Sequence, residues 1–227
     1  MKPPRLGIVT IGQTPRTDVV PEMAEVLGPG IEILERGALD GMDVRGVPAL
    51  APGPGDEVLV TRLRGGASVF VAQRHIVPRV QACLTDLDRA GVAMSAVLCT
   101  GVFPGLASAA PLLSPDRLLL GVLRALAWSG RLGVLAPSTA HLPQTAARWR
   151  GYGFDPVLAV LSPYDEANPA ALALAAEALG GGEAGLIVLD CMGYRRKTKE
   201  ELRGLLGVPV LQPNLLLARV AAELLGA

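Results

Sequence analysis

Short hydrophobic runs of strand length recur along the chain, with amphipathic helical patterns between them. Several runs are apolar at every position, which is typical of strands covered by helices on both faces. The pattern predicts strands at residues 6–11, 31–34, 58–60, 68–72, 92–98, 132–136, 157–161, 186–189 and 208–211. Strands of this kind that alternate with helices predict an α/β fold with parallel sheets.

The helical patterns have clear apolar faces and starts. One helix is predicted to end near Gly91, with an apolar face made by Ile76, Val80, Cys83, Leu84 and Leu87. A second covers residues 118–126 with similar spacing. Further helices are expected to begin near positions 142, 169, 198 and 213.

Two pairs of segments form a weak internal repeat. Residues 6–10 resemble residues 132–136, and each precedes a loop with Thr and Pro and then a helix. Residues 97–101 resemble residues 189–193, and each is a buried strand that ends on a cysteine and a glycine. The repeat predicts two halves that share one plan.

The repeat also predicts how the chain divides into domains. We expect a first α/β domain at residues 1–101 plus 208–227, and a second at residues 102–207. Residues 36–66 occur in the first half only and are rich in Gly and Pro. This insertion is expected to be an excursion from the sheet and not part of its core.

Composition limits the classes of partner. The chain has 21 Lys and Arg residues and 21 Asp and Glu residues. It therefore has no excess of positive charge that would favour binding to nucleic acid. The longest uncharged stretch, residues 91–115, is broken by Gly and Pro, so no membrane span is expected. Three cysteines and the absence of a secretion signal favour the cytoplasm, and a homodimer is left open.

Several cofactor and catalytic motifs are missing from the sequence. It has no Walker P-loop, no G-x-G-x-x-G after the first strand and no Gly-x-Ser-x-Gly. It also has neither His-x-x-x-His nor Cys-x-x-Cys, and only two histidines. The sequence therefore predicts a protein without a nucleotide cofactor and without a metal.

Cys99 and Cys191 stand where predicted strands give way to loops, which is where open α/β sheets bind ligands. A thiol near backbone N–H groups can have its pKa lowered from about 8.5 and act as a base or nucleophile. The alternative is that both simply end buried strands. Because Cys99 and Cys191 form a matched pair, one from each half, we favour the interpretation in which the two thiols act on opposite sides of one carbon atom. Cys83, in contrast, is expected to lie in the core.

Asp190 is expected to be a structural group if strand pleating turns its side chain away from Cys191.

The loop after the first strand is a candidate anion clamp. It carries Gln13, Thr14 and Arg16. Thr14 is expected to cap the next helix, and Arg16 to add a bidentate contact to a carboxylate. Ordinary helix capping beside a solvated arginine remains the alternative.

The corresponding loop of the second half offers hydroxyl groups. Ser138 and Thr139 are expected to contact the substrate, while His141 is expected to be a surface or capping residue that could tune a thiol. Gly193 and Tyr194 follow the second strand-end cysteine and are candidates to contact a carboxylate. The charged run after them is interpreted as a solvated helix face.

Three segments carry a resemblance to the AroM family. They are the opening LGIVTIGQTPR, the segment LDCMGY at residues 189–194, and the ending from residue 208 to residue 225. The resemblance spans nearly the whole chain. It implies no particular reaction by itself.

More distantly, the paired cysteines and tandem halves are similar to the aspartate/glutamate racemase superfamily, with hydantoin racemases, maleate isomerases and arylmalonate decarboxylases. That resemblance implies two Rossmann-like parallel-sheet halves in pseudo-two-fold tandem, with a cofactor-independent site in the cleft between them. Cys99, Thr100 and Cys191 match its motifs, and the Ser138 loop matches its hydroxyl-bearing substrate loop. Met192 stands where the superfamily has a polar residue, which argues against amino-acid racemisation.

The leading hypothesis is a cofactor-independent racemase, isomerase or decarboxylase that acts on a small carboxylic acid. One thiolate abstracts a proton or attacks carbon, and the other thiol returns a proton. The alternative is a non-catalytic protein that binds or senses a small acid. A third hypothesis is an interaction protein without a ligand.

Overall fold

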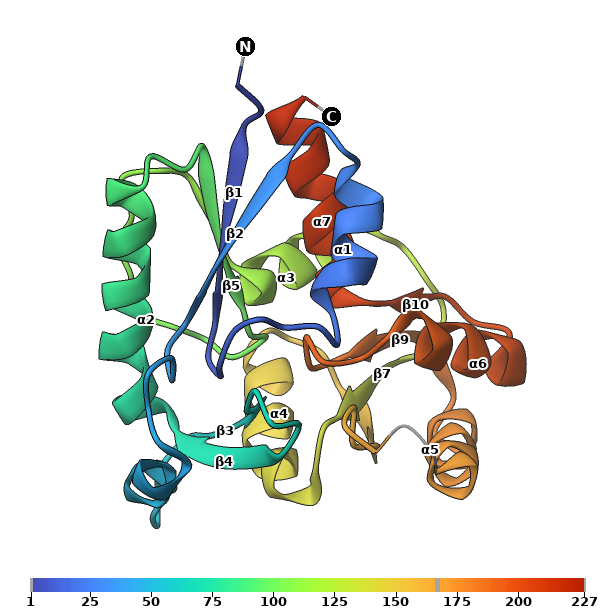
Figure 1. Ribbon diagram of the computed structural model, residues 1–227. Coiled ribbons are helices and arrows are strands. Elements are labelled where there is room, and N and C mark those ends of the chain that lie inside the picture. The colour runs from blue at the N-terminus through green and yellow to red at the C-terminus, as the bar shows by residue number, and fades with distance from the viewer. Residues whose placement is uncertain (1, 166–167, 227) are drawn as a thin grey trace. The chain divides into compact units, whose positions relative to one another are not determined.

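The computed structural model describes residues 2–165 and 168–226 and divides the chain into two compact units. The first unit comprises Met1–Asp116 and Asn214–Ala227, and the second comprises Arg117–Pro213. Both are α/β units, as the hydrophobic pattern predicts. Figure 1 shows the elements in chain order.

The first unit contains a four-stranded parallel sheet in the order β2-β1-β5-β6. Its strands are β1 (Arg5–Thr10), β2 (Glu32–Gly37), β5 (Met94–Leu98) and β6 (Leu112–Leu113). Three helices complete it, namely α1 (Val20–Leu27), α2 (Gln73–Arg89) and α7 (Pro213–Leu225). In Figure 1, α2 lies on one side of this sheet, and α1 and α7 lie on the other.

The second unit has the same topology. Its parallel sheet has the order β10-β9-β7-β8, in which β7, β8, β9 and β10 correspond to β1, β2, β5 and β6. The strands are β7 (Arg131–Ala136), β8 (Pro156–Val160), β9 (Ala184–Leu189) and β10 (Val210–Leu211). The helices are α3 (Pro115–Ala125), α4 (Leu142–Gly151), α5 (Pro169–Gly181) and α6 (Arg196–Leu206).

One glycine of the repeat lets a helix approach each central strand closely. A Cβ atom on Gly7 would lie 2.7 Å from the Leu87 side chain of α2. A Cβ atom on Gly133 would lie 3.1 Å from the Leu179 side chain of α5. The Leu-Gly pair at the start of each half thus reflects the same helix packing.

The boundaries of the two units differ from the sequence-based division. Strand β6 pairs with β5, so residues up to Asp116 belong to the first unit. Strand β10 pairs with β9, so residues up to Pro213 belong to the second. Each unit therefore contains a helix that follows the last strand of the other sheet, α7 in the first and most of α3 in the second.

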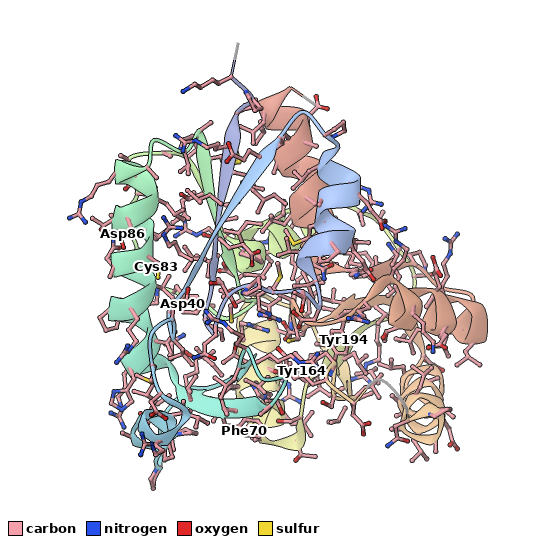
Figure 2. The ribbon with its side chains drawn as sticks, in the orientation of Figure 1. Asp40, Phe70, Cys83, Asp86, Tyr164 and Tyr194 are labelled. Carbon is pink, nitrogen blue, oxygen red and sulfur yellow. The ribbon has the colours of Figure 1, made fainter. Side chains whose placement is uncertain are left out.

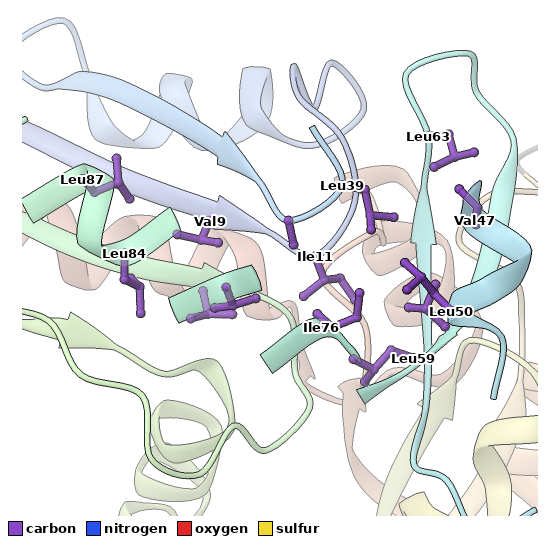
Figure 3. Close-up of a cluster of buried hydrophobic side chains, with 14 of the residues drawn as sticks. Val9, Ile11, Leu39, Val47, Leu50, Leu59, Leu63, Ile76, Leu84 and Leu87 are labelled. Atoms are coloured by element: carbon purple, nitrogen blue, oxygen red, sulfur yellow. The ribbon is translucent and has the colours of Figure 1, made fainter. Parts of the chain in front are cut away.

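The insertion forms a short 3-10 helix, η1 (Val44–Leu50), and leads into an antiparallel hairpin of β3 (Val58–Arg62) and β4 (Ser68–Ala72). The hairpin is a separate two-stranded sheet. The expectation that the insertion stays out of the core is wrong, because its apolar side chains share one cluster with β1 and α2. Figure 3 shows this cluster, which includes Val9, Ile11, Leu39, Val47, Leu50, Leu59, Leu63, Ile76, Leu84 and Leu87.

Gly12 joins the insertion to the main sheet. A Cβ atom at this position would lie 2.4 Å from the carbonyl oxygen of Arg62 and 2.3 Å from the Thr61 hydroxyl. A backbone carbonyl cannot rotate away as a side chain can. Strand β3 therefore approaches the loop after β1 more closely than any side chain at residue 12 allows.

Gly12→Ala is expected to destabilise the first unit by about 1–3 kcal/mol, because β3 must move away from the new methyl group. Gly30→Ala is the matched control, since a Cβ atom there has no neighbour within 4 Å. Urea unfolding of both variants measures the difference. Equal stability of the two variants would contradict this account of Gly12.

Candidate functional site

Each unit places one cysteine just beyond the carboxyl end of a corresponding strand. Cys99 directly follows β5 and is half-buried, and Cys191 comes two residues after β9 and is buried. The three cysteines of the chain are thiols and not disulfides. Because β5 and β9 occupy equivalent places in the two sheets, the cysteines are equivalent in topology.

Both cysteines have the same local geometry. The backbone N–H of Gly101 donates a hydrogen bond to the Cys99 sulfur at 3.4 Å, and the N–H of Gly193 donates to the Cys191 sulfur at 3.4 Å. A donor aimed at sulfur stabilises negative charge on it. The two Cys-x-Gly turns thus place a hydrogen-bond donor against the sulfur in the same way.

Tyr194 stabilises the turn that carries Cys191. This side chain is fully buried, and its hydroxyl donates to the carbonyl oxygens of Leu161 at 2.7 Å and Leu135 at 3.4 Å. Burial raises the pKa of the Tyr194 phenol well above its ordinary value, and the nearby Cys191 and Asp190 add to this. Gln212 donates to the Tyr194 carbonyl oxygen at 3.0 Å. The Tyr194 side chain therefore makes its hydrogen bonds within the second unit.

Asp190 is a structural group of the second unit. It is buried, accepts a hydrogen bond from Trp149 Nε1 at 3.3 Å and forms an ion pair with Arg148. Its backbone N–H donates to Leu135, so β9 stays paired with β7 up to the residue before Cys191. The carboxylate thereby anchors the strand end to α4.

Tyr164 is a candidate site residue that motif reasoning missed. It lies in the loop after β8, and its ring is so close to Gly193 that a Cβ atom there would be 3.0 Å from the ring. Figure 2 labels Tyr164 together with Tyr194. The rule that sites form at the carboxyl ends of strands would have found it, because it follows β8 as Cys191 follows β9.

Ser138 and Thr139 follow β7, the neighbour of β9. Ser138 is half-buried and its Oγ lies 2.8 Å from Nδ1 of His141, while Thr139 is exposed. His141 itself is buried, at 6% exposure, and is therefore not the surface residue that its position suggested. Ser138 and Cys191 thus leave adjacent strands at the same edge of one sheet.

The loop after β1 is bound to the insertion. Gln13 donates to the carbonyl oxygens of Leu39 and Met42 and accepts from the N–H of Arg64. The Thr14 hydroxyl donates to Asp40 at 2.7 Å. The expectation that Thr14 caps the next helix is wrong, because α1 begins only at Val20 and has no side-chain cap.

Arg16 is buried and lies in an internal ion pair. Its guanidinium makes a bidentate contact with Asp18 at 2.8 Å for each nitrogen, and donates to the Thr10 hydroxyl at 2.8 Å. Burial by itself would raise the pKa of the Asp18 carboxyl, but Arg16 outweighs it and holds that pKa below its ordinary value. Arg16 therefore stabilises the first unit through Asp18 and Thr10.

Cys83 differs from the two strand-end cysteines. It lies on α2, and Figure 2 shows it with Asp40 and Asp86. Burial, Asp40 and Asp86 raise the pKa of the Cys83 thiol to about 11.

Alkylation of Cys83 by iodoacetamide is expected to be about a hundredfold slower at pH 8 than that of an ordinary exposed thiol, because so little thiolate is present. Its rate should keep rising with pH up to about 11. Peptide mass spectrometry of the native protein measures all three cysteines at once. A plateau for Cys83 below pH 9 would contradict this assignment.

No helix in the described part of the chain is long and apolar enough to cross a membrane.

Comparison with curated proteins finds no match. Solved structures with 12–18% sequence identity share the fold. Allantoin racemase from Klebsiella pneumoniae has a TM-score of 0.62 at 16% identity, with 98% of this chain and 88% of that chain covered. Picrophilus torridus aspartate racemase has a TM-score of 0.64 at 12% identity, with 98% and 94% covered.

A liganded arylmalonate decarboxylase variant has a TM-score of 0.66 at 18% identity, with 99% of this chain and 93% of that chain covered. These likenesses confirm the expected racemase-like α/β fold. The family model described as AroM protein matches residues 6–225. The chain therefore belongs to the AroM family.

Proposed function

We propose that this protein is a cofactor-independent enzyme that acts on a small carboxylic acid through Cys99 and Cys191. The observation that carries the proposal is the repeated Cys-x-Gly turn, in which a glycine N–H donates to the cysteine sulfur at 3.4 Å in both units. Two equivalent thiols at equivalent strand ends suit a reaction in which one group removes a proton and another supplies one. The shared fold with two racemases and a decarboxylase supports this class of reaction.

The proposed chemistry takes place at the carbon next to a carboxylate. In racemisation, one thiolate takes the proton from that carbon, and the electron pair of the C–H bond moves into an enolate-like anion. The other thiol then gives its proton to the opposite face of the carbon. In decarboxylation, the C–C bond breaks, carbon dioxide leaves, and a thiol protonates the resulting carbanion.

The substrate carboxylate requires hydrogen-bond donors near each thiol. In this proposal they are the hydroxyls of Thr100, Ser138 and Thr139, with Tyr164 beside Gly193. Donors of this kind stabilise the negative charge that develops in the transition state. Ser138 has the strongest structural support, because it leaves the strand next to the one that carries Cys191.

Deuterium incorporation tests the proposal. Small 2-substituted acids, including amino, ureido and aryl acids, are incubated with the protein in D₂O, and NMR follows the proton on the carbon next to the carboxylate. Malonates are followed in parallel for release of carbon dioxide. Exchange or carbon dioxide release that depends on Cys99 and Cys191 supports the proposal, and neither reaction across the panel contradicts it.

A second candidate function is a non-catalytic protein that binds a small acid. Met192 favours it, because this apolar side chain is 2% exposed next to Cys191, where the similar racemases are expected to carry a polar residue. This function predicts that an acid raises the melting temperature even after Cys99 and Cys191 are both replaced by serine. It also predicts no isotope exchange into that acid.

A further inference from the structure

Ser138 and His141 form a hydrogen-bonded pair at the carboxyl edge of the second sheet. Ser138 Oγ and His141 Nδ1 are 2.8 Å apart. Ser138 comes three residues after Leu135, and Cys191 comes two residues after Leu189, and these two leucines are paired across β7 and β9. Ser138 is half-buried and His141 is buried, so Ser138 is the more solvent-accessible residue of the pair.

The direction of the Ser138 proton depends on Nδ1. If Nδ1 carries no proton, the hydroxyl donates its own proton to His141, and its lone pairs are left to accept a bond from a ligand. If Nδ1 carries a proton, it donates to Ser138, and the hydroxyl proton is available to donate elsewhere. A ligand carboxylate needs a donor, so it requires the second arrangement. The charged imidazole always provides this arrangement, whereas the neutral ring provides it in only one of its two tautomers.

Charged groups on two neighbouring elements act on this imidazole. Burial lowers the pKa of His141, Asp190 after β9 raises it, and Arg148 of α4 lowers it. Asp190 and Arg148 form an ion pair with one another, and burial is the largest of the three effects, so the pKa of His141 lies below its ordinary value. His141 is therefore mainly neutral at neutral pH and can take up a proton when a ligand favours the charged form.

We propose that His141 is a positioning residue that decides whether Ser138 accepts or donates a hydrogen bond, and so makes carboxylate binding beside Cys191 dependent on protonation of His141. The proposal rests on the proposed function in taking the ligand to be a carboxylate. By linkage, carboxylate binding favours the protonated form of His141, so affinity rises as the pH falls toward the pKa of His141.

Two alkylating reagents test the proposal. Iodoacetate and iodoacetamide react in the same way, since the thiolate attacks the CH₂ carbon, a C–S bond forms and iodide leaves. At a given pH the thiolate fraction of Cys191 cancels from the ratio of the two rates. The ratio therefore measures the preference of the site for a carboxylate reagent over a neutral amide reagent. Cys83 serves as a control in the same protein.

The proposal predicts that the iodoacetate-to-iodoacetamide ratio at Cys191 rises as the pH falls from 8 to 6, by up to about tenfold per pH unit, the limit for one linked proton. His141→Asn retains a hydrogen-bonding amide but cannot titrate, so its ratio should not change with pH. Ser138→Ala should lose most of the slope, although His141 still titrates. An unchanged slope in Ser138→Ala would overturn the proposal, because the imidazolium charge would then act directly on the carboxylate. A flat wild-type ratio would also overturn it.

A second measurement applies even if neither reagent reaches Cys191. The chain has only two histidines, His75 and His141, so their imidazole NMR signals are simple to assign with a His75→Gln variant. The pKa of His141 should be higher in sodium acetate than in sodium chloride of equal ionic strength, and Ser138→Ala should remove the difference. Equal values in both salts would overturn the proposal. Neither measurement requires turnover, so failure of the deuterium exchange would not be confused with failure of this inference.

Discussion

Replacing either Cys99 or Cys191 with serine is expected to lower deuterium exchange into a substrate acid by about 10²–10⁴-fold, the usual contribution of a positioned acid or base. The serine hydroxyl fits the same space, but it ionises far less readily than a thiol. The glycine N–H that donates to sulfur cannot compensate for that difference. Both single variants should fail, because the proposed reaction needs one group to remove a proton and another to return one.

Cys83→Ser is the matched control for these variants. Cys83 lies on α2, and burial, Asp40 and Asp86 raise its pKa to about 11, so it takes no part in the proposed chemistry. This variant should exchange at the wild-type rate. Wild-type exchange in both Cys99→Ser and Cys191→Ser would rule out the two-thiol mechanism.

Breaking the ion pair between Arg16 and Asp18 is expected to have the largest effect on stability. Arg16→Met leaves the Asp18 carboxylate, 8% exposed, without the bidentate partner that holds its charge. Removal of one partner of a buried pair costs about 3–5 kcal/mol. Urea unfolding of the variant measures this loss.

The exposed pair of Asp43 and Arg45 is the matched control. It also joins an arginine and an aspartate two residues apart, with Nε and Nη2 of Arg45 both donating to Oδ2 of Asp43, but its side chains are 53% and 88% exposed. Arg45→Met should therefore leave the stability unchanged within error. Equal losses in Arg16→Met and Arg45→Met would contradict the structural role assigned to Arg16.

The Asp18 pair also predicts a pH dependence. Because the pKa of Asp18 is lower in the folded protein than its ordinary value, the pair contributes its full stability above that ordinary value, and the contribution falls as the pH drops through the folded pKa. The difference in unfolding free energy between the wild type and Asp18→Asn should therefore shrink in acid. A difference that grew as the pH fell would contradict the sign.

Much of the fold could be predicted because the strands are long, apolar and regularly spaced. Residues 68–72 and the central runs of both sheets are strands in the structure at or near the predicted bounds. Strand β6 has only two residues and follows an irregular segment, so it has no period to detect. The assignment of β6 and β10 to their units could not be predicted either, because the neighbour of a two-residue strand is not visible in the sequence.

The candidate site was less predictable for a different reason. The sequence identifies which residue types follow each strand, but not what they contact. Gln13 and Arg16 were expected to meet a ligand, yet both are bound to groups within the first unit. Tyr164 follows a predicted strand but belongs to no motif, so its place at a strand end is the one sequence signal for it, and its closeness to Gly193 is visible only in the structure.

Cross-linking with dibromoacetone tests most directly whether Cys99 and Cys191 act on one small ligand. The reagent joins two thiols through a three-carbon bridge, and the Cys83→Ser variant removes the third cysteine of the chain. Peptide mass spectrometry should find Cys99 and Cys191 joined within one chain, and an excess of a substrate acid should slow the reaction. If each cysteine is modified separately and no bridged peptide forms, the two thiols do not share a ligand and the proposed function is wrong.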